Sequence, residues 1–221
     1  MKKHIIKFVS KPKIRILFIK FFYKLIIFSY KKLSVLATYN EKKSHEKQDF
    51  LKYENFFIGK LTNSKKVLDV GCSYGELTNA LTKVYPNVHI CGIEIEKYKV
   101  VEARRRYPTA NFLHYDIFDV DLENYDTVVM SNVFEHIEDR VKLIKLFNQA
   151  GVSKILIRVP AYDRDWLIPF FDRYELDYRL DETHFVEFTE DQLKEELKIG
   201  GYVPRSIFMK WGEYYAEFNR S

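Results

Sequence analysis

The sequence predicts an α/β protein built on a doubly wound parallel sheet, and three observations carry this prediction. From residue 65 onward, short apolar segments alternate with segments of helical periodicity, as parallel sheets require. A turn with two glycines follows the first apolar segment, and two further strand-like segments close the chain. A chain of 221 residues is long enough to form one such domain with a buried core and to carry an additional segment.

The composition is that of an ordinary globular protein, with 47% hydrophobic and 30% charged residues. Cys72 and Cys91, the only cysteines, both fall in predicted core elements. This placement indicates a reducing compartment and excludes a disulfide framework or a cysteine metal site. No secretory cleavage pattern is evident, so we expect a cytoplasmic protein.

The positive charge is concentrated at the N-terminus. The whole chain has a net charge of +5, but residues 1–47 hold thirteen Lys or Arg and two Glu, a net of +11, so the remainder carries −6. A nucleic-acid partner would need a basic face on the body itself, and the acidic body disfavours one. We therefore divide the chain into a basic N-terminal segment, 1–47, and a body, 48–221.

Within the N-terminal segment, residues 12–36 are predicted to form one amphipathic helix, with Ser10 as its cap and Pro12 in its first turn. One stripe of this helix carries four basic residues, Lys13, Lys20, Lys24 and Lys31. The longest apolar run, 25–30, is far shorter than the roughly 18 residues of a spanning helix. The helix is therefore predicted either to lie on a membrane surface or to pack on its own body or on a second copy.

The elements of the body follow from periodicity and punctuation. Strands are predicted at 66–70, 88–95, 110–117, 125–132, 153–160, 202–210 and 213–218. Helices are predicted at 75–85, 96–107, 137–150 and 190–200. Pro86 and Pro108 end the first two helices, and Thr189 with Gln192 forms a capping box for the last.

The turn after the first strand favours a cofactor with positive charge and no phosphates. Its glycines, Gly71 and Gly75, are spaced G-C-S-Y-G, whereas a dinucleotide turn reads G-x-G-x-x-G. Asp69 stands two residues before the first glycine, where a carboxylate would repel a pyrophosphate and attract an ammonium group. A nicotinamide oxidoreductase is therefore disfavoured.

Acids also stand at the ends of the next two strands. Glu94 lies 23 residues after Gly71, where a carboxylate can accept both hydroxyls of a ribose. Asp116, near the end of the third strand, is placed to accept an adenine amino group. Three carboxylates at three successive strand ends predict a nucleoside site.

These residues resemble the class I S-adenosylmethionine-dependent methyltransferases, especially the small-molecule group that includes the quinone-biosynthesis enzymes. The similar segments are VLDVGCSYG, GIEIE, HYDIFD, YDTVVMSNVFEHIED and HFVEFTEDQLKEELKIGGY. The resemblance covers about residues 50–221. One departure is the turn before the fifth strand, where AGVSK replaces the family's Lys-Pro-Gly-Gly.

The resemblance implies a Rossmann-like, doubly wound, seven-stranded sheet that binds S-adenosylmethionine. It implies cofactor contacts from Asp69, Gly71, Cys72, Ser73, Gly75, Glu94, Ile95, Asp116, Ile117 and Asn132. It also implies methyl transfer to an acceptor that the motifs do not specify, a small molecule, a glycan or a lipid-linked precursor rather than nucleic acid. A scaffold protein that binds the cofactor without turnover is the alternative from another class.

On the acceptor side, His136 and the preceding Glu135 are the candidate catalytic residues, because a hydroxyl acceptor gains from a base whose pKa is near the working pH. Residues 160–184, rich in aromatic and charged side chains, are predicted to cover the acceptor pocket.

Some relatives, the ubiquinone O-methyltransferases and the small-RNA 3′-end methyltransferases, carry Glu-x-x-Glu-His at this place and bind a divalent metal. The RNA enzymes add a later histidine. Glu135, His136 and His184 match this pattern, but Asn132 replaces the first glutamate. Loss of one anionic ligand weakens a site for a hard cation, so we expect no metal, and metal-assisted O-methylation is kept as an alternative.

Overall fold

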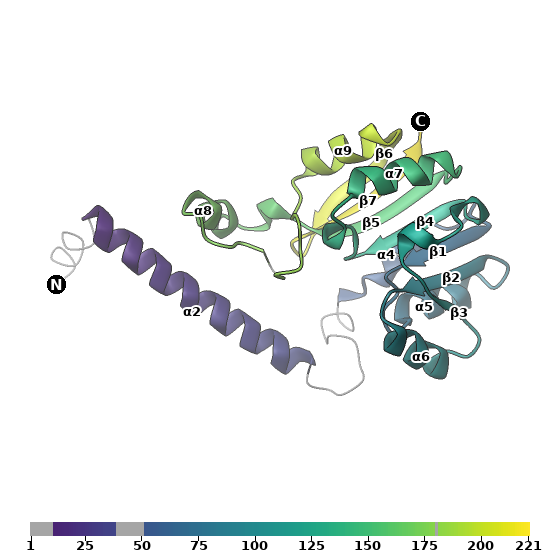
Figure 1. The fold of residues 1–221 in the computed structure, drawn as a ribbon, viewed down its shortest axis with the longest axis horizontal. Coiled ribbons are helices and arrows are strands. Elements are labelled where there is room, and N and C mark those ends of the chain that lie inside the picture. Colours follow the sequence, from purple (N-terminus) through teal and green to yellow (C-terminus); the bar gives the residue numbers. More distant parts are fainter. Residues whose placement is uncertain (1–10, 39–50, 180) are drawn as a thin grey trace. The chain divides into compact units, whose positions relative to one another are not determined.

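The computed structural model describes residues 11–38, 51–179 and 181–221 (Figure 1). The chain divides into two compact units. The first unit joins the N-terminal helix to residues 167–178, and the second contains residues 52–166 and 179–221. The sheet and all residues predicted for the site lie in the second unit.

The described strands of the second unit form one sheet in the order β3-β2-β1-β4-β5-β7-β6 (Figure 1). They are β1 (Lys66–Val70), β2 (His89–Glu94), β3 (Asn111–His114), β4 (Thr127–Ser131), β5 (Lys154–Pro160), β6 (Tyr202–Lys210) and β7 (Glu213–Arg220). β1 to β5 are mutually parallel, and β7 runs antiparallel to β5 and β6. The predicted doubly wound, seven-stranded sheet is confirmed. Its order reverses between β1 and β4, and ligands bind at such a switch point.

Helices fill the connections between these strands. They are α5 (Glu76–Val84), α6 (Lys97–Arg106), α7 (Arg140–Gln149) and α9 (Glu190–Ile199), while α4 (Glu54–Ile58) precedes β1. Short 3₁₀ helices are η1 (Ile117–Asp119), η2 (Leu122–Asn124), η3 (Phe134–His136) and η4 (Tyr162–Arg164). The predicted capping box of Thr189 and Gln192 is present at the start of α9, and Gly200 caps its end.

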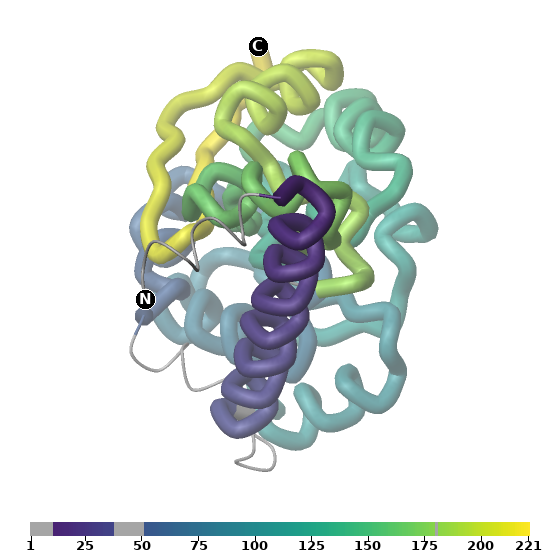
Figure 2. Tube along the Cα trace, turned by 90° about the vertical axis from the view of Figure 1, so that its left-hand side faces the viewer, coloured from purple at the N-terminus to yellow at the C-terminus, as the bar shows by residue number. Residues whose placement is uncertain are grey.

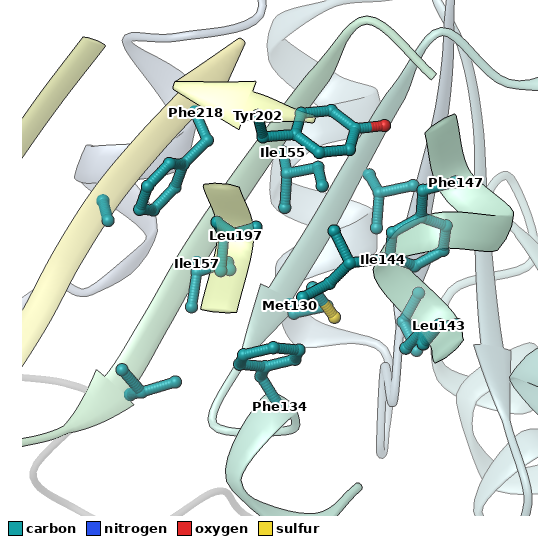
Figure 3. Close-up of a cluster of buried hydrophobic side chains, with 14 of the residues drawn as sticks. Met130, Phe134, Leu143, Ile144, Phe147, Ile155, Ile157, Leu197, Tyr202 and Phe218 are labelled. Carbon is teal, nitrogen blue, oxygen red and sulfur yellow. The ribbon is translucent and has the colours of Figure 1, made fainter. Parts of the chain in front are cut away.

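Successive residues of the central strands face two different cores, because side chains alternate along a strand. In β4, Val128 and Met130 belong to the core that contains Ile144 of α7 and Leu197 of α9 (Figure 3). Val129, between them, belongs to the core formed with α4 and α5. With both faces buried, the strands read as continuous apolar runs, which explains why the sequence pattern located them.

The strands end earlier than predicted on the side that carries the site. β3 was expected to reach residue 117 and stops at His114, and β4 was expected to reach 132 and stops at Ser131. Asp116 and Asn132 therefore lie in the loops beyond the strands. There the Asp116 side chain accepts from the Phe118 amide, and the Asn132 side chain donates to Glu213.

The first unit consists of α2 (Pro12–Thr38) and the segment around α8 (Leu167–Arg173). Figure 2 shows α2 as one continuous helix. It exceeds the predicted range by two residues, and the predicted cap, Ser10, lies outside the described residues. The Tyr23 ring packs edge-on against Phe171 with centroids 5.1 Å apart. The Tyr23 hydroxyl donates to the Asp177 carbonyl over 2.9 Å.

Residues 167–178 are the middle of the segment that was predicted to cover the acceptor pocket, and they group with the N-terminal helix. Over the described residues, no helix is both long enough and apolar enough to cross a membrane.

Candidate functional site

A pocket of about 440 Å³ lies at the carboxyl ends of β1, β2 and β3 and beside the loop after β4. This volume is within the range of small-molecule sites, about 300–1,000 Å³. Six predicted site residues line it, namely Gly71, Glu94, Ile95, Asp116, Ile117 and His136. Sequence reasoning missed other lining residues, among them Tyr115, Phe118, Val133 and Phe185. Three of these lie within three residues of a predicted one, so adjacency was the available signal.

Both glycines of the first turn are required by their surroundings. Gly71 has φ +64°, and a Cβ at this position would lie 2.5 Å from Cγ2 of Val133. Gly75 has φ +88°, and its Cβ would lie 2.5 Å from Cζ of Phe112. A side chain at either position would meet both backbone strain and a collision. The turn therefore brings the loop after β4 directly against the end of β1.

Glu94 ties the turn to the next loop. One of its carboxylate oxygens accepts from the Ser73 amide and the other from the Glu96 amide, each over 3.0 Å. The Cys72 amide donates to the Ile93 carbonyl of β2 over 2.9 Å. Glu94 is buried yet lines the pocket. The structure thus places the predicted ribose acid at the pocket wall, while Cys72 and Ser73 support it through their backbone.

Asp69 is buried and is not among the residues that line the pocket. Its carboxylate accepts from the Thr78 hydroxyl of α5 over 2.6 Å. Burial raises the pKa of Asp69 to about 7, the Thr78 hydrogen bond opposes this shift, and the nearby Glu94 adds to it. In this structure Asp69 joins β1 to α5, and its predicted contact with an ammonium group stays a prediction.

Asp116 follows β3 and is the N-cap residue of η1. Its Oδ1 accepts from the Phe118 amide over 3.0 Å, which starts η1. Tyr115, Ile117 and Phe118 line the same pocket as Asp116. This end of the pocket therefore combines one acid with aromatic and aliphatic side chains, as a nucleobase site would.

The structure brings the adjacent residues Glu135 and His136 together with His184, which is distant in the sequence. One ligand atom from each lies within 4.8 Å of the other two. The rings of His136 and His184 have centroids 4.6 Å apart, and Nε2 of His184 lies 4.0 Å from Oε1 of Glu135. The Thr183 hydroxyl contacts Nδ1 of His136 over 2.9 Å and so fixes its ring.

Polar atoms in this region are buried without partners. Both carboxyl oxygens of Glu135 and Oδ1 of Asn132 lack a hydrogen bond among the described residues, while Nδ2 of Asn132 donates to Glu213 over 3.0 Å. Burial raises the pKa of Glu135 to about 8, against the attraction of Arg158. Burial, followed by the neighbouring histidine, lowers the pKa of His136, so its neutral form is favoured.

Behind the histidines lies a second set of charges that the sequence analysis did not assign. Oε1 of Glu187 lies 3.3 Å from Nδ1 of His184, and its other oxygen pairs with Arg164. Arg158 faces Glu213 over 3.3 Å. Glu187 stands three residues after His184, a spacing that was visible, whereas nothing in the sequence marks Arg164.

Comparison with known proteins finds similarity to methyltransferases. Residues 68–150 match a family model described as a methyltransferase domain. A malonyl-[acyl-carrier protein] O-methyltransferase of Bacillus anthracis is 28% identical over 43% of this chain and 37% of that protein. A trans-aconitate 2-methyltransferase of Escherichia coli is 30% identical over 49% of this chain and 43% of that protein. The matches thus span about two fifths of the length of these curated relatives.

A solved structure agrees in fold. Human N-acetylserotonin methyltransferase, determined in complex with S-adenosylmethionine, superposes with a TM-score of 0.61 at 17% identity, over 79% of this chain and 52% of that one. The sheet therefore has a fold that is also found in a methyltransferase. Residues 68–150, which include the glycine turn, Glu94, Asp116 and His136, match a methyltransferase domain, as the sequence motifs predicted.

Proposed function

We propose that this protein binds S-adenosylmethionine in the pocket at the ends of β1, β2 and β3 and transfers its methyl group to a small-molecule acceptor. The observation that carries the proposal is that Glu94 and Asp116 line one pocket from neighbouring strands, beside the glycine turn. The curated relatives act, by their names, on malonyl-[acyl-carrier protein] and on trans-aconitate, which supports a small acceptor group. Glycan and lipid-linked acceptors are finer hypotheses within this proposal.

The residues present fit this cofactor. A carboxylate can accept about four hydrogen bonds, and Glu94 accepts two from backbone amides. Its remaining sites would accept the ribose hydroxyls. Asp116 would accept the adenine amino group, with Ile117 and Phe118 beside the base. When bound, the cofactor supplies an electrophilic methyl group on a sulfonium. Cys72, Ser73 and Gly75 shape the turn, and Asn132 stands at the loop after β4.

At the acceptor end, His136 is the proposed general base. It lines the pocket, and its Nδ1 is held by Thr183. Because its pKa is lowered by burial, the neutral imidazole is available at neutral pH to take a proton from an acceptor hydroxyl. Glu135, buried against the histidine pair, is proposed to hold the ring arrangement. Transfer is an in-line displacement, so the alignment of donor and acceptor supplies much of the rate.

Calorimetry with S-adenosylmethionine, S-adenosylhomocysteine and NAD tests the proposal. We expect both adenosyl ligands to bind and NAD to be ignored. Absence of binding by either adenosyl ligand would refute the cofactor assignment. A cofactor-binding scaffold would bind both and keep its affinity in His136→Ala, but would release no S-adenosylhomocysteine with any acceptor in a panel of hydroxy and carboxylic acids.

A second candidate function, metal-assisted methylation of a hydroxyl, is favoured by the Glu135, His136 and His184 cluster. Two imidazoles and a carboxylate suit a transition metal better than magnesium. The unpartnered oxygens of Glu135 and Asn132 fit this requirement, because a cation would satisfy buried acceptors. A bound divalent ion would act as a Lewis acid on the acceptor oxygen.

Binding of Mn²⁺ alone, measured by calorimetry without cofactor, tests this second candidate. It predicts one site that His184→Ala abolishes and that His89→Ala, a change at an exposed histidine, leaves intact. Equal weak binding by all three proteins would rule the site out and support the sequence-based expectation of no metal.

A further inference from the structure

One face of α2 exposes a row of large apolar side chains. Leu17, Phe21, Leu25, Phe28 and Leu36 are between 51% and 68% exposed. At 3.6 residues per turn these side chains fall within an arc of about 100°. Phe22, Leu33 and Ile26, which are 42–66% exposed, continue this face to about 180°. An exposed apolar face of this extent marks an interaction surface.

The opposite face of α2 is the one that packs within its own unit. Ile19, Tyr23 and Ile27 are half-buried, and Tyr23 contacts Phe171 and Asp177 of the α8 segment. Tyr23 lies about 170° around the helix from the centre of the apolar arc. The α8 segment therefore anchors α2 through one face and does not account for the other.

The charge on α2 selects the partner. Residues 11–38 contain seven Lys or Arg and no Asp or Glu. Lys13, Lys20 and Lys24 lie about 90° from the centre of the apolar arc, on the flank between the two faces. From this position a lysine stem can run along an apolar surface while its ammonium group reaches the headgroups.

We propose that α2 lies flat on an anionic lipid bilayer, with the apolar arc inserted at the level of the headgroups and the flanking lysines paired with lipid phosphates. A second copy of the chain is the less suitable occupant, since two such helices would bring seven positive charges against seven. This inference is independent of the proposed methyl transfer.

Vesicle flotation of the full chain tests the surface. Vesicles of phosphatidylcholine with about one third phosphatidylglycerol are compared with pure phosphatidylcholine at low and high salt. We expect strong binding to the anionic vesicles, weaker binding to the neutral ones, and partial loss as salt rises. Failure of the wild-type chain to float with anionic vesicles at low salt would overturn the proposal.

Two triple variants separate the apolar from the electrostatic part. Phe21→Ser, Leu25→Ser and Phe28→Ser together should lower binding to both vesicle types by more than about tenfold, because the inserted groups are lost. Lys13→Glu, Lys20→Glu and Lys24→Glu together should lower binding to anionic vesicles by more than about tenfold and leave neutral vesicles little changed.

The matched control replaces three exposed apolar residues of the body, Val84, Val101 and Ile199, with serine. It should bind vesicles like the wild type. Equal loss in this control would show that general hydrophobicity, not α2, drives binding and would refute the proposal. If the wild type is a dimer, the apolar triple variant is a monomer and neither protein floats with vesicles, the apolar face binds a second copy of the chain instead. All variants should keep their affinity for S-adenosylhomocysteine. If the apolar triple variant is unstable, the vesicle binding of the lysine triple variant tests the proposal alone.

Discussion

Replacement of Glu94 by alanine is the most direct perturbation of the proposed cofactor site. The wild-type carboxylate is 7% exposed, lines the pocket and accepts from the Ser73 and Glu96 amides at 3.0 Å. Glu94→Ala removes the acceptor of two backbone amides and the proposed acceptor of the ribose hydroxyls in one step. The free energy of unfolding and the free energy of cofactor binding should therefore both fall.

The loss of binding free energy can be worked out from the ribose hydroxyls that would lack their acceptor in Glu94→Ala. A buried polar group that loses its partner costs about 1–3 kcal/mol. At 1.4 kcal/mol per factor of ten, this raises the Kd for S-adenosylhomocysteine by about 5- to 150-fold. Loss of the two amide contacts, each worth about 1 kcal/mol in a typical hydrogen bond, should lower the melting temperature of the free protein.

Calorimetry at a temperature well below both transitions separates the two effects. Glu96→Gln is the matched control, because it neutralises a neighbouring acid whose side chain pairs with Lys99 and keeps the backbone amide that Glu94 uses. The control should bind within about threefold of wild type, since a surface ion pair contributes little. Wild-type affinity in a folded Glu94→Ala protein would mean that the ribose assignment is wrong.

Three further outcomes are expected. Gly71→Ala should destabilise the protein more than Gly151→Ala, measured by denaturant unfolding, because both have positive φ but only the first Cβ would meet a side chain at 2.5 Å. Burial raises the pKa of Asp69 to about 7, so the native state holds a proton that the unfolded chain releases above about pH 4. The share of Asp69 in the unfolding free energy should therefore fall by about 2 kcal/mol between pH 5 and 7, and Asp69→Asn should reduce the total fall by that amount and leave the share of Glu135, whose pKa burial raises to about 8. Treatment with a chelator should leave the methyltransferase activity unchanged. If the chelator abolishes activity and added manganese restores it, the metal-assisted candidate is favoured.

The sequence predicted that Glu94 and Asp116 lie close together, and both line one pocket because their arrangement is local. Glu94 ends β2 and Asp116 follows β3, and parallel strands bring their carboxyl ends to one edge of the sheet. Glu94 and Asp116 are therefore neighbours through sheet order alone, which strand periodicity was enough to predict. Gly71 and Gly75 were visible for a similar reason, since a tight turn constrains residue type within a few positions.

The proposed acceptor side could not be predicted to the same degree because it depends on packing between distant segments. The pairing of His136 with His184 requires the loop before α9 to return to the loop after β4, as the bond from the Phe185 amide to the Glu135 carbonyl shows. Arg164 approaches Glu187 only through this return. The anchoring of α2 by the α8 segment likewise joins residues about 150 positions apart, beyond any periodicity.

The two candidate mechanisms differ in what neutralises Glu135. A fully buried carboxyl group without a hydrogen-bond partner is too costly to leave charged and isolated, so either a proton or a cation must accompany it. Glu135→Gln separates the two, because an amide imitates the protonated carboxyl in shape and charge but lacks the anionic oxygen that a cation prefers. If the site works without metal, Glu135→Gln should have an activity within about threefold of the wild type, and chelators should not affect it. If a cation sits between Glu135 and the histidines, loss of an anionic ligand should weaken Mn²⁺ binding by at least about tenfold, and activity should fall with it until excess manganese is supplied. The variant that keeps its activity but loses a measurable metal site would separate metal binding from catalysis altogether.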